Sequence, residues 1–419
     1  MSDPIFRDVT RPEEVRLEAQ RCGGCNQECM TCNVGIEIPK LMDLLKDGYF
    51  EEAGKLLAEQ NPFASTCGRI CAAPCQTKCP QNINIKAIEK FLGDQYVAEV
   101  QKGKKNKRKV AIVGAGTAGL TVSEEFLKKG YEVSVYEATP TPGGFVQHFV
   151  SEQRFPSKIK KRNVDRVLSE VKFIPNTIVG ASPKVNELAE QFDAVVLATG
   201  ANAPSALQVE GEHLKNIYTA AEYIRGAAPS TKVRTIVVGG DHVALDCARL
   251  AAKKGDKVTL IDRHAQQSLK LDHATLSSAQ DEGIRFMLLT QPVRFLGEKK
   301  VTGIECMQMM VTQSDFDDSW ITVPIEDSQF PIECDRVIIA IGFDPNPSIG
   351  NLCSDLRCVG KGRLWTDENH MTTIPGVFAA GSSSPHKTIE HARRVVEKID
   401  TLLNEPASTD AILEAMRNG

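Results

Sequence analysis

Apolar and polar positions along this chain follow a strand–helix–strand order. The apolar run at 110–113 predicts a buried strand, the pattern at 121–129 predicts a helix, and 132–136 predicts a second strand. Strands that alternate with helices are typical of parallel sheets covered by helices. The sequence therefore predicts an α/β fold from about residue 106 onward.

The same unit occurs a second time at 234–264, with a strand at 235–238, a helix at about 242–254 and a strand at 257–261. Further helical and strand patterns lie at 157–170, 171–174, 192–198, 283–311, 334–342, 374–380 and 388–403. This order predicts two nested Rossmann-like domains, the first of which is completed by the C-terminal segment.

Residues 1 to about 100 carry no parallel-sheet pattern. Apolar residues recur at helical spacing at 38–58 and 83–97, and 11–21 is typical of a charged helix. The basic stretch 101–109 indicates a linker or, alternatively, a docking patch for an acidic electron carrier. The predicted domains are 1–105 (helical), 106–228 (first nucleotide domain), 229–342 (second nucleotide domain) and 343–419 (the rest of the first).

The first loop, with Gly114, Gly116 and Gly119, lies between the predicted strand and helix. Glycines at this spacing permit a tight turn, close approach of the backbone to a pyrophosphate, and close packing of the helix on the strand. Glu137 follows the next strand, where an acid can bind ribose hydroxyls. These residues predict a dinucleotide site.

The second loop has Gly239 and Gly240, but Asp241 replaces its middle glycine. A carboxylate about 4 Å from a pyrophosphate would be repelled by ~4 kcal/mol at a surface-like dielectric. Either this side chain points away or the site is weak or vestigial, and we expect a working site. Asp262 ends the second strand and favours NAD over NADP, although Arg263, the basic residue after it, makes the signal mixed.

Composition narrows the function. The 419 residues carry a net charge of −4 with both signs interspersed, which indicates neither nucleic acid nor an anionic membrane as a partner. There is no run of 18 apolar residues, and the start lacks the apolar core of a secretion signal, so we expect a cytoplasmic protein. Disulfides are rare in that compartment.

Eight of the 13 cysteines lie within the first 79 residues, in two groups whose neighbouring members are three or four positions apart. They are Cys22, Cys25, Cys29 and Cys32, then Cys67, Cys71, Cys75 and Cys79. Such thiolates suit iron–sulfur clusters or zinc, and iron–sulfur is favoured because a chain with two nucleotide sites has use for one-electron centres. The other five cysteines are scattered and are expected to be buried and inert.

The stretches TCGRICAAPCQTKC and INIKAIEKFL, followed by GAGTAGL, PTPGG, LATGA, VALDCAR, AIGFDPN and GVFAAG, resemble the small-subunit family of NADPH-dependent glutamate synthase. Relatives of that family include the amino-terminal part of dihydropyrimidine dehydrogenase. The resemblance implies a helical domain with two [4Fe-4S] clusters, followed by an FAD domain that an NAD(P)H domain interrupts.

The resemblance also implies the cluster ligands. Cys22, Cys25, Cys29 and Cys79 would bind the cluster nearer the FAD. Cys32, Cys71, Cys75 and an oxygen of Glu89 would bind the second, and Cys67 would not be a ligand. Four early plus four late cysteines remain an alternative, and Glu89 could equally be a solvated helix carboxylate.

For FAD, the resemblance implies Gly114, Gly116, Gly119, Glu137, Gly144, Gly200, Gly381 and the backbone around Thr388. For the nicotinamide nucleotide, the second loop supplies Gly239, Gly240, Asp262 and Arg263. Ser382 and the stretch 148–151 depart from the family pattern at details of the flavin site. No catalytic acid–base pair or nucleophile is apparent outside the cofactor sites.

The sequence thus predicts an electron-transfer subunit that links NAD(H), FAD and two clusters to other subunits of a multi-subunit oxidoreductase or to a ferredoxin-like carrier. An NAD-type acid in a short chain resembles the NADH-producing subunit of a 2-oxoacid complex such as phenylglyoxylate dehydrogenase. Two alternatives are an NADPH-oxidising glutamate synthase-type small subunit and a non-catalytic, cluster-bearing assembly module.

Overall fold

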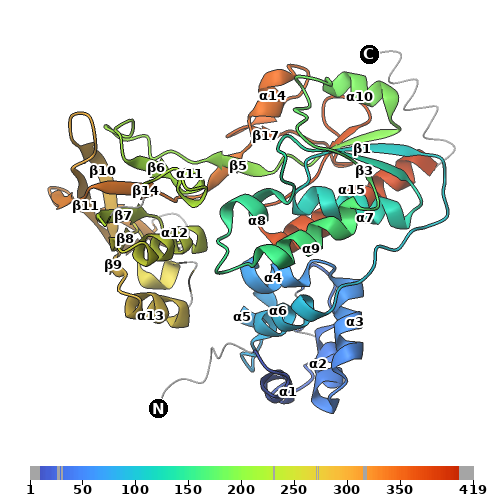
Figure 1. Ribbon diagram of the computed structural model, residues 1–419, viewed down its shortest axis with the longest axis horizontal. Coiled ribbons are helices and arrows are strands. Elements are labelled where there is room, and N and C mark those ends of the chain that lie inside the picture. Colours follow the sequence, from blue (N-terminus) through green and yellow to red (C-terminus); the bar gives the residue numbers. More distant parts are fainter. Residues whose placement is uncertain are drawn as a thin grey trace. The chain divides into compact units, whose positions relative to one another are not determined.

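The computed structural model describes residues 10–25, 29, 32–229, 232–269, 271, 273–314 and 319–404. The chain forms two compact units (Figure 1). The first comprises Met1–Gln147, Phe155–Ala201 and Pro345–Gly419, and the second His148–Arg154 and Asn202–Asp344.

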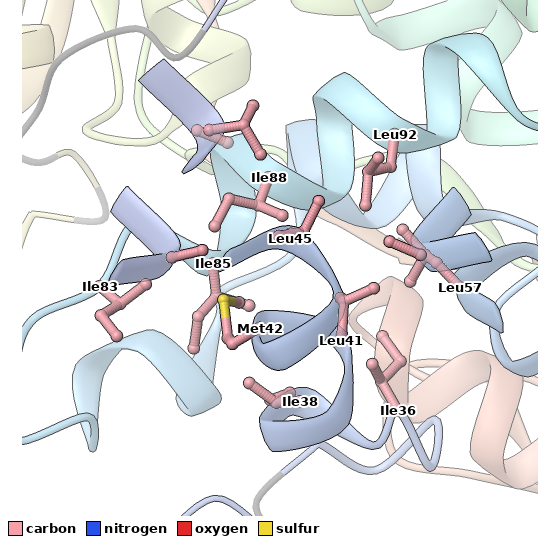
Figure 2. Close-up of a cluster of buried hydrophobic side chains, with 14 of the residues drawn as sticks. Ile36, Ile38, Leu41, Met42, Leu45, Leu57, Ile83, Ile85, Ile88 and Leu92 are labelled. Carbon is pink, nitrogen blue, oxygen red and sulfur yellow. The ribbon is translucent and has the colours of Figure 1, made fainter. Parts of the chain in front are cut away.

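The first unit begins with six helices: α1 (Pro12–Gln20), α2 (Ile38–Asp47), α3 (Phe50–Gln60), α4 (Ala64–Ile70), α5 (Pro74–Thr77) and α6 (Ile85–Gln95). The helical pattern predicted at 38–58 is two helices, because Gly48 ends α2 in the left-handed conformation with φ 86°. The apolar faces of α2 and α6 supply Leu41, Leu45, Ile88 and Leu92 to one core, in which all four are fully buried (Figure 2).

Helices α4 and α6 cross with their backbones in contact. A Cβ on Gly68 of α4 would lie 2.3 Å from the backbone nitrogen of Lys90, and one on Gly93 of α6 would lie 2.3 Å from that of Ser65. Only glycine allows this approach. The crossing matters because α4 carries Cys67 and α6 carries Glu89.

The remainder of the first unit is built on a parallel sheet in the order β18-β4-β1-β2-β3. Its strands are β1 (Lys109–Val113), β2 (Glu132–Tyr136), β3 (Lys172–Ile174), β4 (Ala194–Leu197) and β18 (Val377–Ala379). Its helices are α7 (Thr117–Lys128), α8 (Gly144–Phe149), α9 (Ser157–Leu168), α10 (Val185–Gln191), α14 (Ser348–Leu352) and α15 (Pro385–Asn404). The C-terminal strand β18 pairs with β4, so the C-terminal segment completes this sheet as predicted.

Helices α7 and α15 cover one face of this sheet, where Phe126 and Val122 pack with Val395 and Ile399, and α10 covers the other (Figure 1). The helical part packs on the same domain through a second apolar cluster that joins Phe63 and Cys71 to Leu120, Val164 and Ile389.

Arg393 of α15 adds polar contacts between the helical part and the sheet domain. Its Nη1 donates to the carbonyl of Val34 at 2.7 Å, its Nη2 to that of Gln60 at 3.0 Å, and its Nε to Glu125 Oε1 at 3.2 Å. One side chain of the C-terminal helix therefore bonds to both parts of the first unit.

The second unit has its own parallel sheet in the order β6-β14-β7-β8-β9, and an antiparallel sheet in which β11 pairs with β10, β12 and β13. Its strands are β6 (Ile217–Thr219), β7 (Arg234–Val238), β8 (Lys257–Ile261), β9 (Arg285–Met287), β10 (Thr290–Leu296), β11 (Gly303–Gln313), β12 (Trp320–Pro324), β13 (Phe330–Glu333) and β14 (Arg336–Ile339). Its helices are α11 (Ala220–Ile224), α12 (His242–Lys253), the 3-10 turn η1 (Gln266–Ser268) and α13 (His273–Asp281). Shorter pairs elsewhere are β5 (Ala201–Pro204) with β15 (Phe343–Pro345), and β16 (Cys358–Val359) with β17 (Arg363–Leu364).

The structure assigns residues 202–228 to a different domain from the sequence-based prediction, which placed them in the first nucleotide domain. They belong to the second unit because β6 pairs with β14 of the second sheet. A three-residue strand carries too little periodicity to reveal which sheet it joins. In the part of the chain that the structure describes, no helix is long and apolar enough to cross a membrane.

The crossing of α4 and α6 can be tested with Gly93→Ala. We expect this substitution to destabilise the protein by about 1–3 kcal/mol, because the added methyl overlaps backbone that cannot move alone. Gly116→Ala is the matched control, since its Cβ would make only an ordinary contact, 3.6 Å from Cα of Gly144. Thermal unfolding of both variants measures the difference, and equal losses would contradict the importance of the backbone contact.

Candidate functional site

The first glycine loop connects β1 to α7 and fits a bound pyrophosphate. A Cβ on Gly119 would lie 1.9 Å from the carbonyl oxygen of Gly114, and one on Gly114 would lie 2.4 Å from that of Ala198. Gly116 is the N-cap of α7, and having no side chain it leaves the first amide groups of the helix without a cap from its own N-cap residue. Uncapped amides at a helix N-terminus are a binding site for phosphate.

Glu137 follows β2 and lies beside this loop. Its Oε2 accepts a hydrogen bond from the Ala115 amide at 2.9 Å, and its Oε1 accepts from the Thr139 amide, also at 2.9 Å. These bonds hold the carboxylate at the carboxyl edge of the sheet, next to the loop. This is where an acid binds the ribose of a dinucleotide.

Gly144 belongs to a separate loop that closes on the first. The amide of Gly143 donates to the carbonyl of Ala115 at 2.9 Å. Gly144 has φ 54°, and a Cβ there would lie 2.7 Å from Cα of Gly116. The two loops can approach this closely because both contact positions are glycine.

Gly200 follows β4, which pairs with β1, and Gly381 follows β18, which pairs with β4, so both lie at the same edge of the parallel sheet as Gly114. The amide of Gly381 donates to Nδ1 of His391 at 3.1 Å. Thr388 is buried in the first turns of α15, and its hydroxyl donates to the carbonyl of Ser382 at 3.0 Å. All the residues predicted for FAD thus come from one sheet edge and the helix starts above it.

The second loop, between β7 and α12, repeats this geometry. A Cβ on Gly239 would lie 2.1 Å from the carbonyl oxygen of Ala340, and one on Gly240 would lie 2.6 Å from Oδ2 of Asp262. Asp262 is buried, and its Oδ1 accepts from the amide and from Nδ1 of His264, both at 2.8 Å. Arg263 is exposed.

Asp241 makes the second loop different from the first. It occupies the N-cap of α12, and its Oδ1 accepts hydrogen bonds from the amides of Val243 at 2.9 Å and Ala244 at 3.0 Å. The side chain therefore does not point away, which was one of the two possibilities left by the sequence. It lies on the amide groups that, at α7, no side chain caps.

The early thiols form one group together with Cys79. The sulfurs of Cys25 and Cys29 are 4.0 Å apart. Burial, together with the neighbouring thiols of Cys25, Cys22 and Cys79, raises the pKa of Cys29 to about 11. Cys79, from the late group of the sequence, thus lies with three early cysteines, which a division into four early and four late cysteines does not predict.

The second group surrounds a small pocket in the first unit. Its lining includes Cys32, Cys67, Cys71, Cys75, Glu89 and His386. Burial and the nearby Glu89, Cys32 and Cys71 raise the pKa of Cys75. Burial also raises the pKa of Glu89 to about 7, while its Oε1 accepts from Asn61 Nδ2 at 3.1 Å. Glu89 is therefore not a solvated carboxylate.

The order of the two groups relative to the flavin domain bears on one expectation. The resemblance placed Cys22, Cys25, Cys29 and Cys79 nearer the FAD, whereas Cys67, Cys71 and Cys32 are the thiols that pack with residues of the flavin-domain helices. Cys22 and Cys79 lie in the core of the helical part, and Cys29 packs against that core. This packing favours the second group as the one next to the flavin domain, which sequence spacing alone does not reveal.

His386 is a residue that the sequence analysis left without a role. It is buried at the start of α15, and its Nδ1 lies 3.1 Å from Sγ of Cys71 and 3.3 Å from Oγ of Ser384. Burial lowers the pKa of this imidazole, which favours its neutral form. It directly joins the flavin-domain helix to the second thiol group, and no sequence signal linked these two positions, which are 315 residues apart.

Within the described ranges, no three side chains of His, Cys, Asp or Glu form a site for a single metal ion. A four-iron cluster needs thiolates around a larger centre, and two separate thiol groups suit such clusters. The donor sets of both groups therefore fit iron–sulfur ligation.

The fold and site together define a class: an electron-transfer oxidoreductase that uses FAD and a nicotinamide nucleotide and carries a 4Fe-4S domain. The family model described as pyridine nucleotide-disulphide oxidoreductase matches residues 108–398. The model described as dihydropyrimidine dehydrogenase domain II, 4Fe-4S cluster, matches residues 5–101. The chain belongs to the pyridine nucleotide-disulphide oxidoreductase family.

Curated relatives confirm the resemblance to the glutamate synthase small-subunit family. The NADPH-Fe(3+) oxidoreductase subunit beta of Geobacter sulfurreducens is 33% identical over 344 residues, 76% of this chain and 51% of that protein. The NADP(+)-dependent formate dehydrogenase subunit beta of Moorella thermoacetica is 28% identical over 88% of this chain and 57% of its own length. The glutamate synthase [NADPH] small chain of Azospirillum brasilense is 28% identical, over 88% and 84%. The chain thus spans little more than half the length of the first two.

Solved structures confirm the fold. FprA of Mycobacterium tuberculosis in complex with NADPH superposes with a TM-score of 0.59 at 18% identity, covering 74% of this chain and 89% of that one. Thioredoxin reductase of T. acidophilum superposes with a TM-score of 0.52 at 19% identity, covering 73% and 100%. At these identities the likeness concerns the fold alone, and it agrees with the two predicted nucleotide domains.

The uncapped helix N-terminus of the first loop can be tested by giving it a carboxylate. We expect Gly116→Asp to weaken FAD binding about a hundredfold or more, because the new carboxylate would cap α7 and repel the phosphates. Gly116→Ala should retain FAD, since its Cβ lies 3.6 Å from Cα of Gly144, an ordinary contact. Flavin absorbance of the purified proteins measures both, and FAD retained by the aspartate variant would contradict the assignment.

Proposed function

We propose that this chain transfers electrons between NAD(H), FAD and two [4Fe-4S] clusters on behalf of a partner oxidoreductase. The observation that carries the proposal is the packing of a thiol-lined cavity directly on the flavin domain, with His386 of α15 3.1 Å from Cys71. A one-electron centre and a flavin held in one compact unit form a path from a two-electron carrier to a one-electron carrier.

The proposed ligands of one cluster are Cys22, Cys25, Cys29 and Cys79, and those of the other are Cys32, Cys71, Cys75 and Glu89. The two thiol groups support this division. Glu89 is supported by its burial and by its place in the same cavity as the three thiols. Cys67 also lines that cavity, but it is buried within α4, among the apolar residues that join α4 to the flavin domain.

Bound FAD would convert a two-electron hydride transfer into single-electron steps, and bound clusters would carry the single electrons. The chain's own residues bind and orient these groups. The amides of the first loop and of α7 would hold the pyrophosphate, Glu137 the ribose, and the amino end of α15 would place a positive dipole end by the flavin.

The proposed nucleotide is NAD(H), because Asp262 stands at the position where an acid binds both ribose hydroxyls and repels a 2′-phosphate. His264 is half exposed and bonded to this carboxylate, and Arg263 is exposed beside it. A cationic pair at this place would instead attract a phosphate. The relatives described above are named for NADPH or NADP(+), which favours that second possibility.

The proposed partner is the catalytic part of a 2-oxoacid oxidoreductase of the phenylglyoxylate dehydrogenase type, to which this chain would contribute the NADH-producing step. The relatives named as beta subunits or small chains support a partner subunit in general. A second candidate is a subunit that consumes NADPH for a glutamate synthase-type partner, which the Azospirillum brasilense relative favours.

Nucleotide preference can be measured by anaerobic bleaching of the flavin. We expect NADH to reduce it with at least about tenfold higher kcat/KM than NADPH, and Asp262→Ser to lower that ratio by about tenfold because repulsion of the 2′-phosphate is removed. Asp327→Asn, at an exposed turn of the same unit, is the control and should leave the ratio unchanged. A wild-type preference for NADPH would favour the second candidate, and bleaching by neither nucleotide would favour the assembly module.

The division of ligands can be tested with two buried cysteines four residues apart. We expect wild-type protein to contain about eight iron atoms per chain, Cys71→Ala about four, and Cys67→Ala the full number. Iron and acid-labile sulfide analysis after anaerobic reconstitution measures this, and the electron paramagnetic resonance of the reduced protein shows which cluster is lost. Loss of a cluster from Cys67→Ala would make Cys67 a ligand.

A further inference from the structure

The two glycine loops have similar geometry but differ in the residue at the N-cap of the helix that follows. At α7 the N-cap is Gly116, which offers no side-chain cap. At α12 the N-cap is Asp241, whose Oδ1 accepts from the amides of Val243 at 2.9 Å and Ala244 at 3.0 Å. Both N-caps have an extended backbone, so the difference lies in the side chain.

The groups that Asp241 bonds are those a dinucleotide needs. Amides at the start of the helix after the first strand hold the pyrophosphate, and the helix dipole adds a partial positive charge there. A carboxylate already bonded to them satisfies the amides and cancels the favourable field. A pyrophosphate at this place would meet a negative charge in place of free donors.

The rest of the loop keeps the close backbone packing of a nucleotide-binding loop. A Cβ at position 240 would clash with Asp262, and a Cβ at position 239 would clash with Ala340. The segment at 148–154 adds a partly buried cation, Arg154, whose Nε lies 3.6 Å from Oδ2 of Asp246 and within electrostatic reach of Asp241. A helix that had merely lost its ligand would have no need of these constraints.

We propose that Asp241 is an internal anion that occupies the pyrophosphate position of the nucleotide domain and sets its affinity for dinucleotide. Nucleotide binds with its pyrophosphate on α12 only after the carboxylate has left the amides of Val243 and Ala244. This inference rests on the proposed function in one respect, that the second domain binds a nicotinamide nucleotide.

An ordinary helix cap and an internal anion have opposite consequences when they are removed. Loss of a cap lowers stability and leaves ligand affinity unchanged or weaker. Loss of an internal anion lowers stability in the same way but strengthens binding of the competing anion. Asn separates the two, because it caps helices about as well as Asp but carries no charge.

The experiment measures dissociation constants of NADH and NADPH by calorimetry on the flavin-loaded full chain, for wild type, Asp241→Asn and Asp241→Gly. We expect both variants to bind dinucleotide at least about tenfold more tightly than wild type, with Asp241→Gly the tighter of the two. Asp241→Gly should also unfold at a lower temperature without nucleotide and gain more than wild type when nucleotide is added.

Thr219→Ala is the matched control, because Thr219 caps α11 in the same unit through its bond from the Glu222 amide. It should lose stability and leave both dissociation constants unchanged. Equal or weaker binding by the two Asp241 variants would overturn the inference, and so would a tightening of similar size in Thr219→Ala.

Binding is measured here without electron transfer, so failure of the inference is distinct from failure of the proposed function. A wild-type flavin that NADH bleaches rapidly, together with variants of unchanged affinity, leaves the function and removes the role of Asp241. If the variants bind nucleotide tightly and the wild type does not bind it, the inference is supported. The wild-type nucleotide site is then identified as closed.

Discussion

The amide groups at the amino end of a helix that follows a parallel strand attract an anionic partner, and both nucleotide domains are built around such a helix end. In the first domain three glycines and a second glycine loop bring the backbone close to the amino end of α7 without adding a side chain to it. In the second domain the same backbone is present, but Asp241 supplies the anion from within the chain. Two copies of one supersecondary unit therefore differ at the helix N-terminus by a single side chain.

The helical part and the flavin domain depend on each other through the C-terminal helix. Helix α15 covers one face of the flavin sheet, contacts the second thiol group through His386, and bonds through Arg393 to backbone carbonyls of the helical part. The second thiol group is thereby held against a helix from the far end of the chain, since Cys71 and His386 are 315 residues apart in sequence. This arrangement suits electron transfer, because it places the thiol-lined cavity and the flavin domain in one unit with a shared apolar core.

Much of the fold was accessible from sequence because its signals are local. A strand, a glycine turn and a helix that follow one another specify a parallel unit, and both copies form where the pattern predicts them. The resemblance assigned Gly114, Gly200 and Gly381 to one FAD site, and these residues lie after β1, β4 and β18, whose carboxyl ends share one edge of the sheet. Short elements were less accessible: β6 assigns residues 202–228 to the second unit through pairing with β14, and Gly48 divides one predicted helix into two.

The sequence by itself determined the class of protein, the two nucleotide units and the presence of two sets of thiols, since spacing along the chain dictates turns and helix faces. Only the tertiary structure decided which thiols meet, that Glu89 is buried among them, that the Cys71 group is the one against the flavin domain, and where the carboxylate of Asp241 points. These depend on how helices cross and which rotamer a side chain adopts. Contacts between distant segments set both, and no local pattern encodes them.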